Sequence, residues 1–416
     1  MAMGTSREAL IVGAGVGGLA AANALHHTGW HVTVLERADA LRPIGAGIAL
    51  PPNAMHALDA VRLGGADGDT DGRVTLGAAV RTVGVAAGAI GARRPDGGWI
   101  FRPSGDPMAR RFGYPVYSLA RTALLDTFAA QLPADAIRFD ADARTIDPGS
   151  AGSRARVETA GGSAYEADLV VAADGGRSAA RRALFPDHPG PADGGYAIWW
   201  MLGPALGDED EEVVATESLG KGAVWGTWML GDGRIYAYAT VLKKLMARAD
   251  DGGGSRSGDP LSVLRAQFAG WYPQIQRILD AVDPASVYCD DARWMKTPLP
   301  TYHRGRVVLL GDAAHPMTPD LGQGGSQSIE DAVVLAKLLG GAEDGSRLFE
   351  ALAAYTAARL PRTMDIVKRS KRMAGFHHPT SPLGILLRDQ ALRLSNSERT
   401  VSLLLRSFDP VFGWKP

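Results

Sequence analysis

The chain has 416 residues, which is enough for two domains or for one elaborated domain with a large core. Its composition, 46% hydrophobic and 21% charged, is that of an ordinary globular protein, and its formal net charge of -1 gives no general attraction to nucleic acid or anionic membranes. Cys289 is the only cysteine, so the sequence excludes an internal disulfide and a cysteine-based zinc or iron–sulfur site. The first ten residues lack the layout of a signal peptide and no apolar run reaches transmembrane length, so we expect a cytoplasmic protein without a membrane span.

The stretch 10–37 predicts a strand, a glycine turn, a helix and a second strand. Gly13, Gly15 and Gly18 fill G-x-G-x-x-G after an apolar run, and Glu36 follows the second run about 20 residues further on. The first glycine permits a tight turn, the second lets a pyrophosphate approach the backbone, and the third lets the helix lie close to the strand. Glu36 would accept hydrogen bonds from an adenosine ribose. These features in this order predict a dinucleotide site, whereas a lone glycine fingerprint would be weak evidence.

The next segments each leave two interpretations open. The glycine-rich loop at 42–48 could lie against a flat ligand, because it has few side chains to clash, or it could be an ordinary flexible loop. Arg121 begins a stretch with apolar residues at helical spacing. A helix N-terminus disfavours a cation unless an anion is nearby, so Arg121 is either an anion contact or a solvated side chain.

Two later apolar runs end at an aspartate. The run 167–173 is followed by Asp174, and the run 306–310 leads to Asp312. Ligands of open α/β sheets bind at the carboxyl ends of the strands, so both carboxylates are candidates for that edge. Asp312 could accept hydrogen bonds from sugar or ribityl hydroxyls, while Asp174 could also be a structural Asp-Gly turn.

A glycine-rich string at 322–325 precedes a predicted helix over 326–339. The partial positive charge of that helix N-terminus would face whatever lies above the glycines, and an anionic reduced flavin ring would suit it.

The region 186–296 has the pattern of an antiparallel sheet. Strands are predicted at 197–202, 223–230 and 234–242, with a hairpin turn at 231–233. Aromatic residues concentrate there, either as core or as an apolar substrate wall over a cofactor. We select three of them as substrate-contact candidates, which are Trp199, Trp225 and Tyr236. The remaining 347–406 reads as helices.

Three motifs in this order carry a family resemblance: GAGVGG with Glu36, VVAADG, and VVLLGDAAHPMTPDLGQGG. Together they resemble the single-component (class A) FAD-dependent aromatic hydroxylases, the 4-hydroxybenzoate hydroxylase-like group, with motifs most similar to urate and salicylate hydroxylase-type members. The resemblance implies an α/β fold with a Rossmann-type (GR2-like) FAD-binding domain, an inserted antiparallel β-sheet substrate domain and C-terminal helices. The expected boundaries are 1–75, 116–185 and 297–345 for the FAD-binding domain, 76–115 and 186–296 for the substrate domain, and 346–416 for the helices.

The resemblance also implies which residues bind the cofactors, FAD and transient NADPH or NADH. Arg42 matches an arginine beside the FAD pyrophosphate, and Asp174 belongs to a motif shared between FAD and the nicotinamide cofactor. No second glycine fingerprint for the nicotinamide cofactor is present, as is typical of the family. The implied cofactor-binding residues are Gly13, Gly15, Gly18, Glu36, Arg37, Arg42, Arg121, Asp174 and Asp312, with Pro319, Gly322, Gly324 and Gly325 along the isoalloxazine.

The chemistry that the resemblance implies is a monooxygenation. FAD reduced by NAD(P)H reacts with O2 to a C4a-hydroperoxide, which transfers one oxygen atom to an aromatic or polyketide-like molecule. Asp320 resembles the aspartate of urate-hydroxylating relatives in a Thr-Pro-Asp-x-Gly-Gln-Gly string, which makes it a candidate base; a loop-capping acid is the alternative. The arginine expected on a urate-binding sheet is not evident at 221–225, which argues against urate itself.

Alternatives to hydroxylation remain. Zeaxanthin epoxidase-like enzymes share the Gly-Gln-Gly-Gly segment, so an epoxidase or a flavin dehydrogenase of an apolar metabolite is a rival, and a non-catalytic flavin-binding protein is a rival of another class. We expect a small-molecule aromatic substrate and O2 as partners, no nucleic acid, no metal, and a monomer or homodimer.

Overall fold

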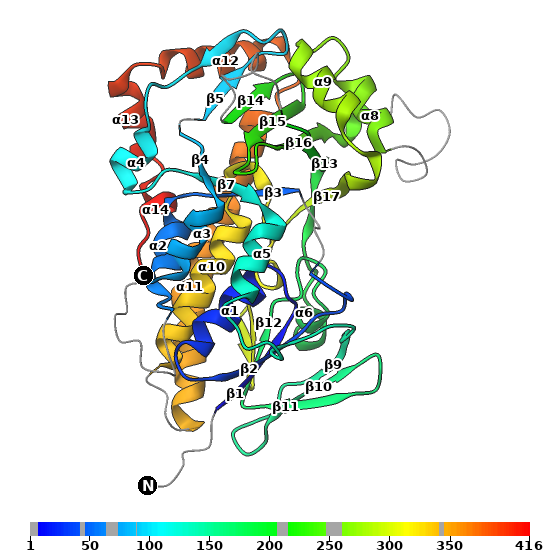
Figure 1. Cartoon of the computed structure of the whole chain (residues 1–416), viewed down its shortest axis with the longest axis vertical. Helices are drawn as coiled ribbons and strands as arrows, with labels where there is room; N and C mark the ends of the chain where they lie inside the picture. The colour runs from blue at the N-terminus through cyan, green and yellow to red at the C-terminus, as the bar shows by residue number, and fades with distance from the viewer. Residues whose placement is uncertain are drawn as a thin grey trace.

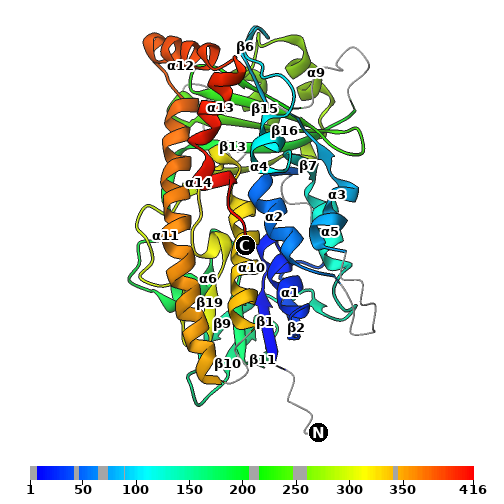
Figure 2. The same cartoon turned by 90° about the vertical axis from the view of Figure 1, so that its left-hand side faces the viewer.

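The computed structural model describes residues 7–41, 46–63, 74–88, 90–205, 215–246, 260–340 and 345–416. Two β-sheets lie at opposite ends of the long axis of the molecule, and long helices connect them (Figure 1). Figure 2 shows α11 (Gly345–His377) running along one side, from the level of the first sheet to that of the second.

A mostly parallel sheet organises the N-terminal end of the molecule. Its strand order is β18-β19-β12-β1-β2-β8, and only β18 is antiparallel to its neighbour. The strands are β1 (Glu8–Val12), β2 (His31–Leu35), β8 (Ile137–Arg138), β12 (Leu169–Ala172), β18 (His303–Arg304) and β19 (Val307–Leu309). The central strands are continuous apolar runs that are buried, which is the pattern of a parallel sheet covered on both faces. The main hydrophobic core therefore forms around these strands.

Two helices with glycine at their starts lie side by side next to this sheet. They are α1 (Val16–His26) and α10 (Gly324–Leu339). A Cβ on Gly17 would lie 2.9 Å from the Cβ of Ser328, so a larger residue at this position would separate the two helices. The predicted helix over 326–339 is confirmed and begins slightly earlier.

The second sheet has seven strands in the order β17-β13-β16-β15-β14-β5-β6. All pairs are antiparallel except β14 with β5. The strands are β5 (Gly91–Arg93), β6 (Trp99–Phe101), β13 (Ala192–Gly203), β14 (Ala215–Leu219), β15 (Ala223–Met229), β16 (Ile235–Leu242) and β17 (Tyr288–Trp294). One face of this sheet packs on α8 (Pro260–Gln267) and α9 (Pro273–Ala281), and these form a separate core cluster.

Smaller elements lie around and between the two large sheets. Three-stranded sheets are formed by β3 (Gly47–Leu50), β7 (Tyr117–Ala120) and β4 (Val85–Ala86), and by β9 (Ala143–Asp147), β10 (Ala155–Thr159) and β11 (Ala164–Ala167). The helices here are α2 (Pro52–Ala60), α3 (Leu76–Val83), α4 (Pro107–Phe112), α5 (Arg121–Ala129), α6 (Ala179–Leu184) and α7 (Lys243–Met246). Leu76 and Val80 belong to the main core around the parallel sheet, so α3 lies with that part, although the predicted boundary put it in the substrate domain.

The chain after α11 is helical, as predicted. It forms α12 (Pro382–Leu394), α13 (Glu398–Arg406) and α14 (Asp409–Phe412). Ser381 and Ser397 accept backbone hydrogen bonds at the starts of α12 and α13, which are the positions where serine stabilises a helix N-terminus. Among the helices of the described ranges, none is long and apolar enough to cross a membrane.

Candidate active site

The predicted cofactor motifs meet at the carboxyl edge of the parallel sheet. Gly13, Glu36 and Asp174 follow β1, β2 and β12, which are adjacent strands, and Asp312 follows β19, the next strand along. Parallel strands end at the same edge, so four signals that are far apart in sequence lie beside one another.

The glycine turn has the geometry that each of its glycines was predicted to allow. Gly13 has φ +102°, and a Cβ there would lie 2.7 Å from the carbonyl oxygen of Ala173. A Cβ on Gly18 would lie 1.8 Å from the carbonyl oxygen of Gly13, so only glycine lets α1 start this close to the turn. Around Gly15, the residue before α1, no heavy atom of the described chain lies within 4 Å of the added Cβ. This open space at a helix N-terminus is suited to a phosphate group.

Glu36 fixes the other side of the turn. Its Oε2 accepts a hydrogen bond of 2.8 Å from the backbone N–H of Ala14, and its Oε1 accepts one of 2.9 Å from that of Ala38. Each carboxylate oxygen has a second lone pair that can accept from a ribose hydroxyl. Arg37, predicted to bind the cofactor, is exposed beside Glu36, and Arg42 lies outside the described residues.

Asp312 and two arginines form the charged part of the edge. The Asp312 side chain is exposed, although many protein atoms lie around the edge where it is placed. Burial raises the pKa of Asp312, while His315, Arg121 and Arg181 oppose that rise. Burial lowers the pKa of the Arg121 guanidinium, and Asp312 opposes that change. Arg121, the first residue of α5, therefore lies in the field of an anion, which favours the anion-contact interpretation over a merely solvated side chain.

Asp174 carries an acceptor atom without a partner. Its Oδ2 accepts a hydrogen bond of 3.0 Å from the N–H of Ala180, while its Oδ1 is buried and has no hydrogen-bond partner within the described part of the chain. Buried polar atoms are nearly always paired, so an acceptor left open at this edge indicates a donor supplied by a ligand.

The glycine-rich string forms the loop before α10. The short 3-10 helix η4 (Pro319–Leu321) ends at Gly322, which has φ +61° and no described heavy atom near its added Cβ. A Cβ on Gly324 would lie 3.8 Å from Asp312 Oδ1, and one on Gly325 would lie 2.9 Å from Ile48 of β3. The loop therefore lies against the charged edge, and the N-terminus of α10 points to the same place.

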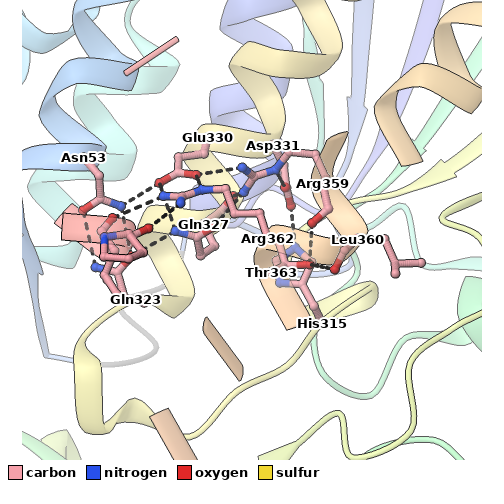
Figure 3. Close-up of polar contacts among 12 residues, drawn as sticks. Asn53, His315, Gln323, Gln327, Glu330, Asp331, Arg359, Leu360, Arg362 and Thr363 are labelled. Atoms are coloured by element: carbon pink, nitrogen blue, oxygen red, sulfur yellow. Dashed lines mark hydrogen bonds and ion pairs between the residues drawn. The ribbon is translucent and has the colours of Figure 1, made fainter. Parts of the chain in front are cut away.

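Next to this loop, α10 and α11 are joined by a buried ionic network (Figure 3). Glu330 and Asp331 of α10 are fully buried, and Arg359 of α11 binds both: its Nη1 lies 2.7 Å from Glu330 Oε2 and its Nε lies 2.5 Å from Asp331 Oδ1. Arg362 donates two further hydrogen bonds to Glu330, of 2.7 and 2.8 Å. Buried charges require such pairing because their desolvation is costly.

The network also contacts the segment around Asp312 and the helix α2. Asp331 Oδ2 accepts from the N–H of Gly311 at 2.9 Å and lies 2.6 Å from His315 Nε2, and Glu330 Oε1 accepts from Asn53 at 2.7 Å. Burial by itself would raise the pKa of Asp331, but His315 and Arg359 outweigh it and lower that pKa to about 2.

Asp320, the predicted catalytic base, is bound on both oxygens. Its Oδ2 accepts a hydrogen bond of 2.5 Å from the hydroxyl of Tyr196, its Oδ1 lies 3.3 Å from His377 Nδ1, and only 3% of its side chain is exposed. Burial would raise the pKa of Asp320, but His377 and Tyr196 together lower it, so the side chain is a carboxylate. This arrangement ties η4 to β13 and to the end of α11, as the loop-capping alternative expects.

The face of the second sheet that packs against β3, next to the start of α10, differs in part from the prediction. Tyr236 lies on it, because a Cβ on Gly47 would be 2.4 Å from the Tyr236 ring. Trp199 and Trp225 instead lie in the core cluster formed with α8 and α9, on the opposite face, which corrects their assignment as substrate-contact residues. Their neighbours Trp200 and Trp228 lie with Tyr236. Side chains alternate between faces along a strand, so the error is one of register.

The comparisons with known proteins identify the family. The sequence matches the family described as FAD binding domain over residues 6–200 and 279–370, which is more than half of the chain. The chain belongs to this family.

Several known proteins are similar to this chain over nearly its whole length. The aurachin C monooxygenase/isomerase of Stigmatella aurantiaca is 32% identical over 409 residues, which are 95% of this chain and 96% of the relative. The 3-amino-4-hydroxybenzoate 2-monooxygenase of Streptomyces cremeus is 34% identical over 394 residues, covering 92% and 91% of the two chains. The crystal structure of Klebsiella pneumoniae HpxO with FAD and uric acid has a TM-score of 0.80 and 26% identity, covering 97% of this chain and 99% of that one. The chain is an FAD-dependent monooxygenase, with NAD(P)H as the reductant typical of the family.

The site of this FAD-binding family member fits the cofactor on structural grounds. Within the described residues, the space around Gly15 is open for a phosphate and Asp174 Oδ1 is an acceptor without a partner. Asp312 and Arg121, which interact electrostatically, add a charged edge. Sequence reasoning missed the network of Glu330, Asp331 and Arg359 and the contact of His377. Adjacent acids inside a predicted buried helix were the available signal for the first, whereas nothing in the sequence pointed to the second.

Proposed function

We propose that this FAD-dependent monooxygenase uses NADPH or NADH and O2 to hydroxylate an apolar aromatic or polyketide-like small molecule. The observation that carries the proposal is the aromatic face of the second sheet, formed by Trp200, Tyr236 and Tyr238, which packs near β3 and β7. An apolar wall of this kind suits a ring system better than a highly polar one.

The names of the relatives do not indicate one substrate, so the choice of substrate rests on the residues of the sheet face. One is named for aurachin C and the other for 3-amino-4-hydroxybenzoate, although both cover nearly the whole of this chain at similar identity. The shared fold therefore supports the reaction class, and the residues on the sheet face support the choice of an apolar aromatic.

Each part of the chain has a distinct task in this reaction. When bound, FAD supplies the redox chemistry, which is hydride acceptance from NAD(P)H and activation of O2. The N-terminus of α10, at Gly324 and Gly325, would stabilise negative charge on the bound cofactor. The apolar face of Tyr236 and Trp200 excludes water from the reacting atoms. Asp320 holds η4 in place through Tyr196 and His377.

The test is NADPH and NADH oxidation by the FAD-loaded protein in air, across phenols, fused-ring aromatics and alkenes, with isotopically labelled O2. We expect a substrate-stimulated rate and a product that carries one labelled oxygen atom on an aromatic carbon. Label in an epoxide would change the reaction type, and a desaturated product without label would mean a dehydrogenase. Bound FAD that neither nucleotide reduces would refute the oxygenase function.

A further inference from the structure

A row of side chains crosses the sheet face that carries Tyr236. In the sheet register, Tyr288 pairs with Trp200, Trp200 with Tyr238, Tyr238 with Gly226, and Gly226 with Glu217. The rings of Trp200 and Tyr288 stack at 5.4 Å between centroids. Tyr236 and Tyr238 are two residues apart on β16, so they point to the same face. The row is aromatic over most of its length and ends at a carboxylate.

Gly226 makes this end of the row possible. A Cβ on Gly226 would lie 2.1 Å from the Tyr238 ring, so the ring lies across β15 in the space where a side chain would be. From there the Tyr238 hydroxyl donates a hydrogen bond to Glu217 Oε1. The glycine, the tyrosine and the glutamate therefore form one unit.

In the part of the chain that the structure describes, the second oxygen of Glu217 accepts no hydrogen bond. Glu217 Oε2 lies 3.8 Å from His377 Nε2, which is close enough for an ion pair but too long for a hydrogen bond. The Glu217 side chain is 23% exposed, against 12% for His377 and 3% for Asp320. Of the groups in this cluster, Glu217 is the one that a bound molecule can reach most easily.

Glu217, Asp320 and His377 form a cluster in which two acidic side chains share one basic ring, so acidic groups outnumber basic ones. Glu217 and Asp320 share His377; burial would lower the pKa of His377, but the two carboxylates outweigh it and raise that pKa, while Arg388 opposes them. The guanidinium of Arg388 is bound to the carbonyl oxygens of Leu219 and Gly220 and to Asp389. Burial lowers the pKa of the neighbouring His378, which contacts Thr240, so it adds no charge.

We propose that Glu217, oriented by Tyr238 and His377, is the polar recognition group of the substrate site. Its Oε2 accepts a hydrogen bond from an O–H or N–H on a neutral aromatic substrate, and the negative cluster excludes aromatic carboxylates. The inference rests on the proposed function, because it narrows the substrate of the same site.

Both halves of this selectivity have a physical basis. A substrate O–H or N–H would donate to a carboxylate oxygen, and hydrogen bonds to charged acceptors are stronger than those between neutral groups. A substrate carboxylate would instead face Glu217 and Asp320 with the single imidazolium of His377 between them, and like charges at close range discriminate strongly against a ligand. The expected preference for a phenol over the matched benzoate is therefore at least about tenfold.

The test measures binding without turnover. The FAD-loaded protein is titrated with three matched pairs, phenol and benzoate, 1-naphthol and 1-naphthoate, and 8-hydroxyquinoline and quinoline-8-carboxylate, while the flavin absorbance and fluorescence are recorded. Variants are Glu217→Gln and Glu217→Ala, with Glu350→Gln, an exposed residue on α11, as the matched control. FAD content and melting temperature show whether each variant is folded.

The expected result has two parts. The wild type and Glu350→Gln bind the hydroxy compound of at least one pair about tenfold or more tightly than the carboxylate. In Glu217→Gln this ratio falls by about tenfold, because the carboxylate gains affinity, and in Glu217→Ala the hydroxy compound loses affinity to a similar extent. The proposal is overturned if no hydroxy compound perturbs the flavin, if carboxylates bind more tightly to the wild type, or if a folded Glu217→Gln keeps the wild-type ratio.

Failure of the proposed function would look different. A flavin that NAD(P)H cannot reduce, with the binding ratios as expected, would reject the oxygenase and leave the recognition role of Glu217 intact. A labelled product, together with affinity ratios that do not change when Glu217 is replaced, would support the oxygenase and reject the recognition role of Glu217.

Discussion

Replacing Arg359 tests whether the buried network holds the flavin-side loops together. In Arg359→Met, Asp331 loses its Nε contact of 2.5 Å, Glu330 loses one of 2.7 Å, and Gln327 loses one of 2.8 Å. Methionine fills much of the space, so the main cost is the uncompensated charge. Breaking a buried ion pair by removing one partner costs roughly 3–5 kcal/mol.

The surviving contacts place the expected cost at the lower end of that range. Glu330 keeps both hydrogen bonds from Arg362, and Asp331 keeps His315 and the N–H of Gly311. We therefore expect a loss of about 3 kcal/mol, which in a chain of this size lowers the melting temperature by roughly 3 °C. FAD should also bind more weakly, because Asp331 holds Gly311 directly before Asp312.

The assay is thermal and urea unfolding of the FAD-loaded protein, together with an FAD titration of the apoprotein. The matched control is Arg369→Met, which removes an exposed pair with Asp365 on the same helix and should cost less than about 1 kcal/mol. In the double variant Arg359→Met with Asp331→Asn, the loss should be smaller than the sum of the two single losses. If Arg359→Met were as stable as the control, the network would not be what holds these loops.

Three further predictions follow from the same geometry. Gly15→Ala should fold normally but bind FAD more weakly in a titration, because its Cβ meets only the open space, whereas Gly18→Ala should lose both stability and FAD through its clash with the turn. The pKa of Asp331 falls from 3.8 to about 2 on folding, so its ionisation contributes on the order of 2 kcal/mol to the free energy of unfolding above pH 4. This contribution is lost as the pH falls towards 2, so the free energy of unfolding of Asp331→Asn should depend less on pH in that range. Gly226→Ala should displace the Tyr238 ring and weaken binding of 1-naphthol to the loaded protein, and unchanged binding would contradict the packing described for this pair.

The FAD-binding part could be predicted from the sequence because its signals are local. A glycine fingerprint constrains the backbone of one turn, and Gly13 and Gly18 tolerate no other side chain for reasons of direct contact. Acidic residues at the ends of apolar runs, such as Asp174 and Asp312, could also be placed, since parallel strands end at one edge. Arg121 was harder, because Asp312, with which it interacts electrostatically, follows a strand almost 200 residues later in the chain.

The face of the seven-stranded sheet to which each aromatic residue points could not be predicted from local sequence patterns. Trp199 and Trp200 are adjacent on β13, and they point to opposite faces because the side-chain period of a strand is two. The sequence pattern does not decide which face meets the cofactor, since both faces of this sheet are apolar and buried: one packs on α8 and α9, the other meets the flavin-side part. In a sheet with one solvated face the alternation of polar residues would have settled the register.

Helix α11 carries two site residues, Arg359 and His377, that the sequence pattern did not predict. Its pattern predicts only a helix whose exposed face is basic at Lys368, Arg369, Lys371 and Arg372. Lys371 departs from this prediction, because it donates a hydrogen bond to the carbonyl oxygen of Gly194. Yet Arg359 is buried in the ionic network beneath the flavin-side loop, and His377, the last residue of the helix, lies between Asp320 and Glu217. One straight element thus places a cation under the cofactor loop and another beside the substrate sheet. A change at Arg359 should therefore lower FAD retention with substrate discrimination kept, whereas a change at His377 should alter substrate discrimination and also loosen η4, because His377 contacts both Glu217 and Asp320.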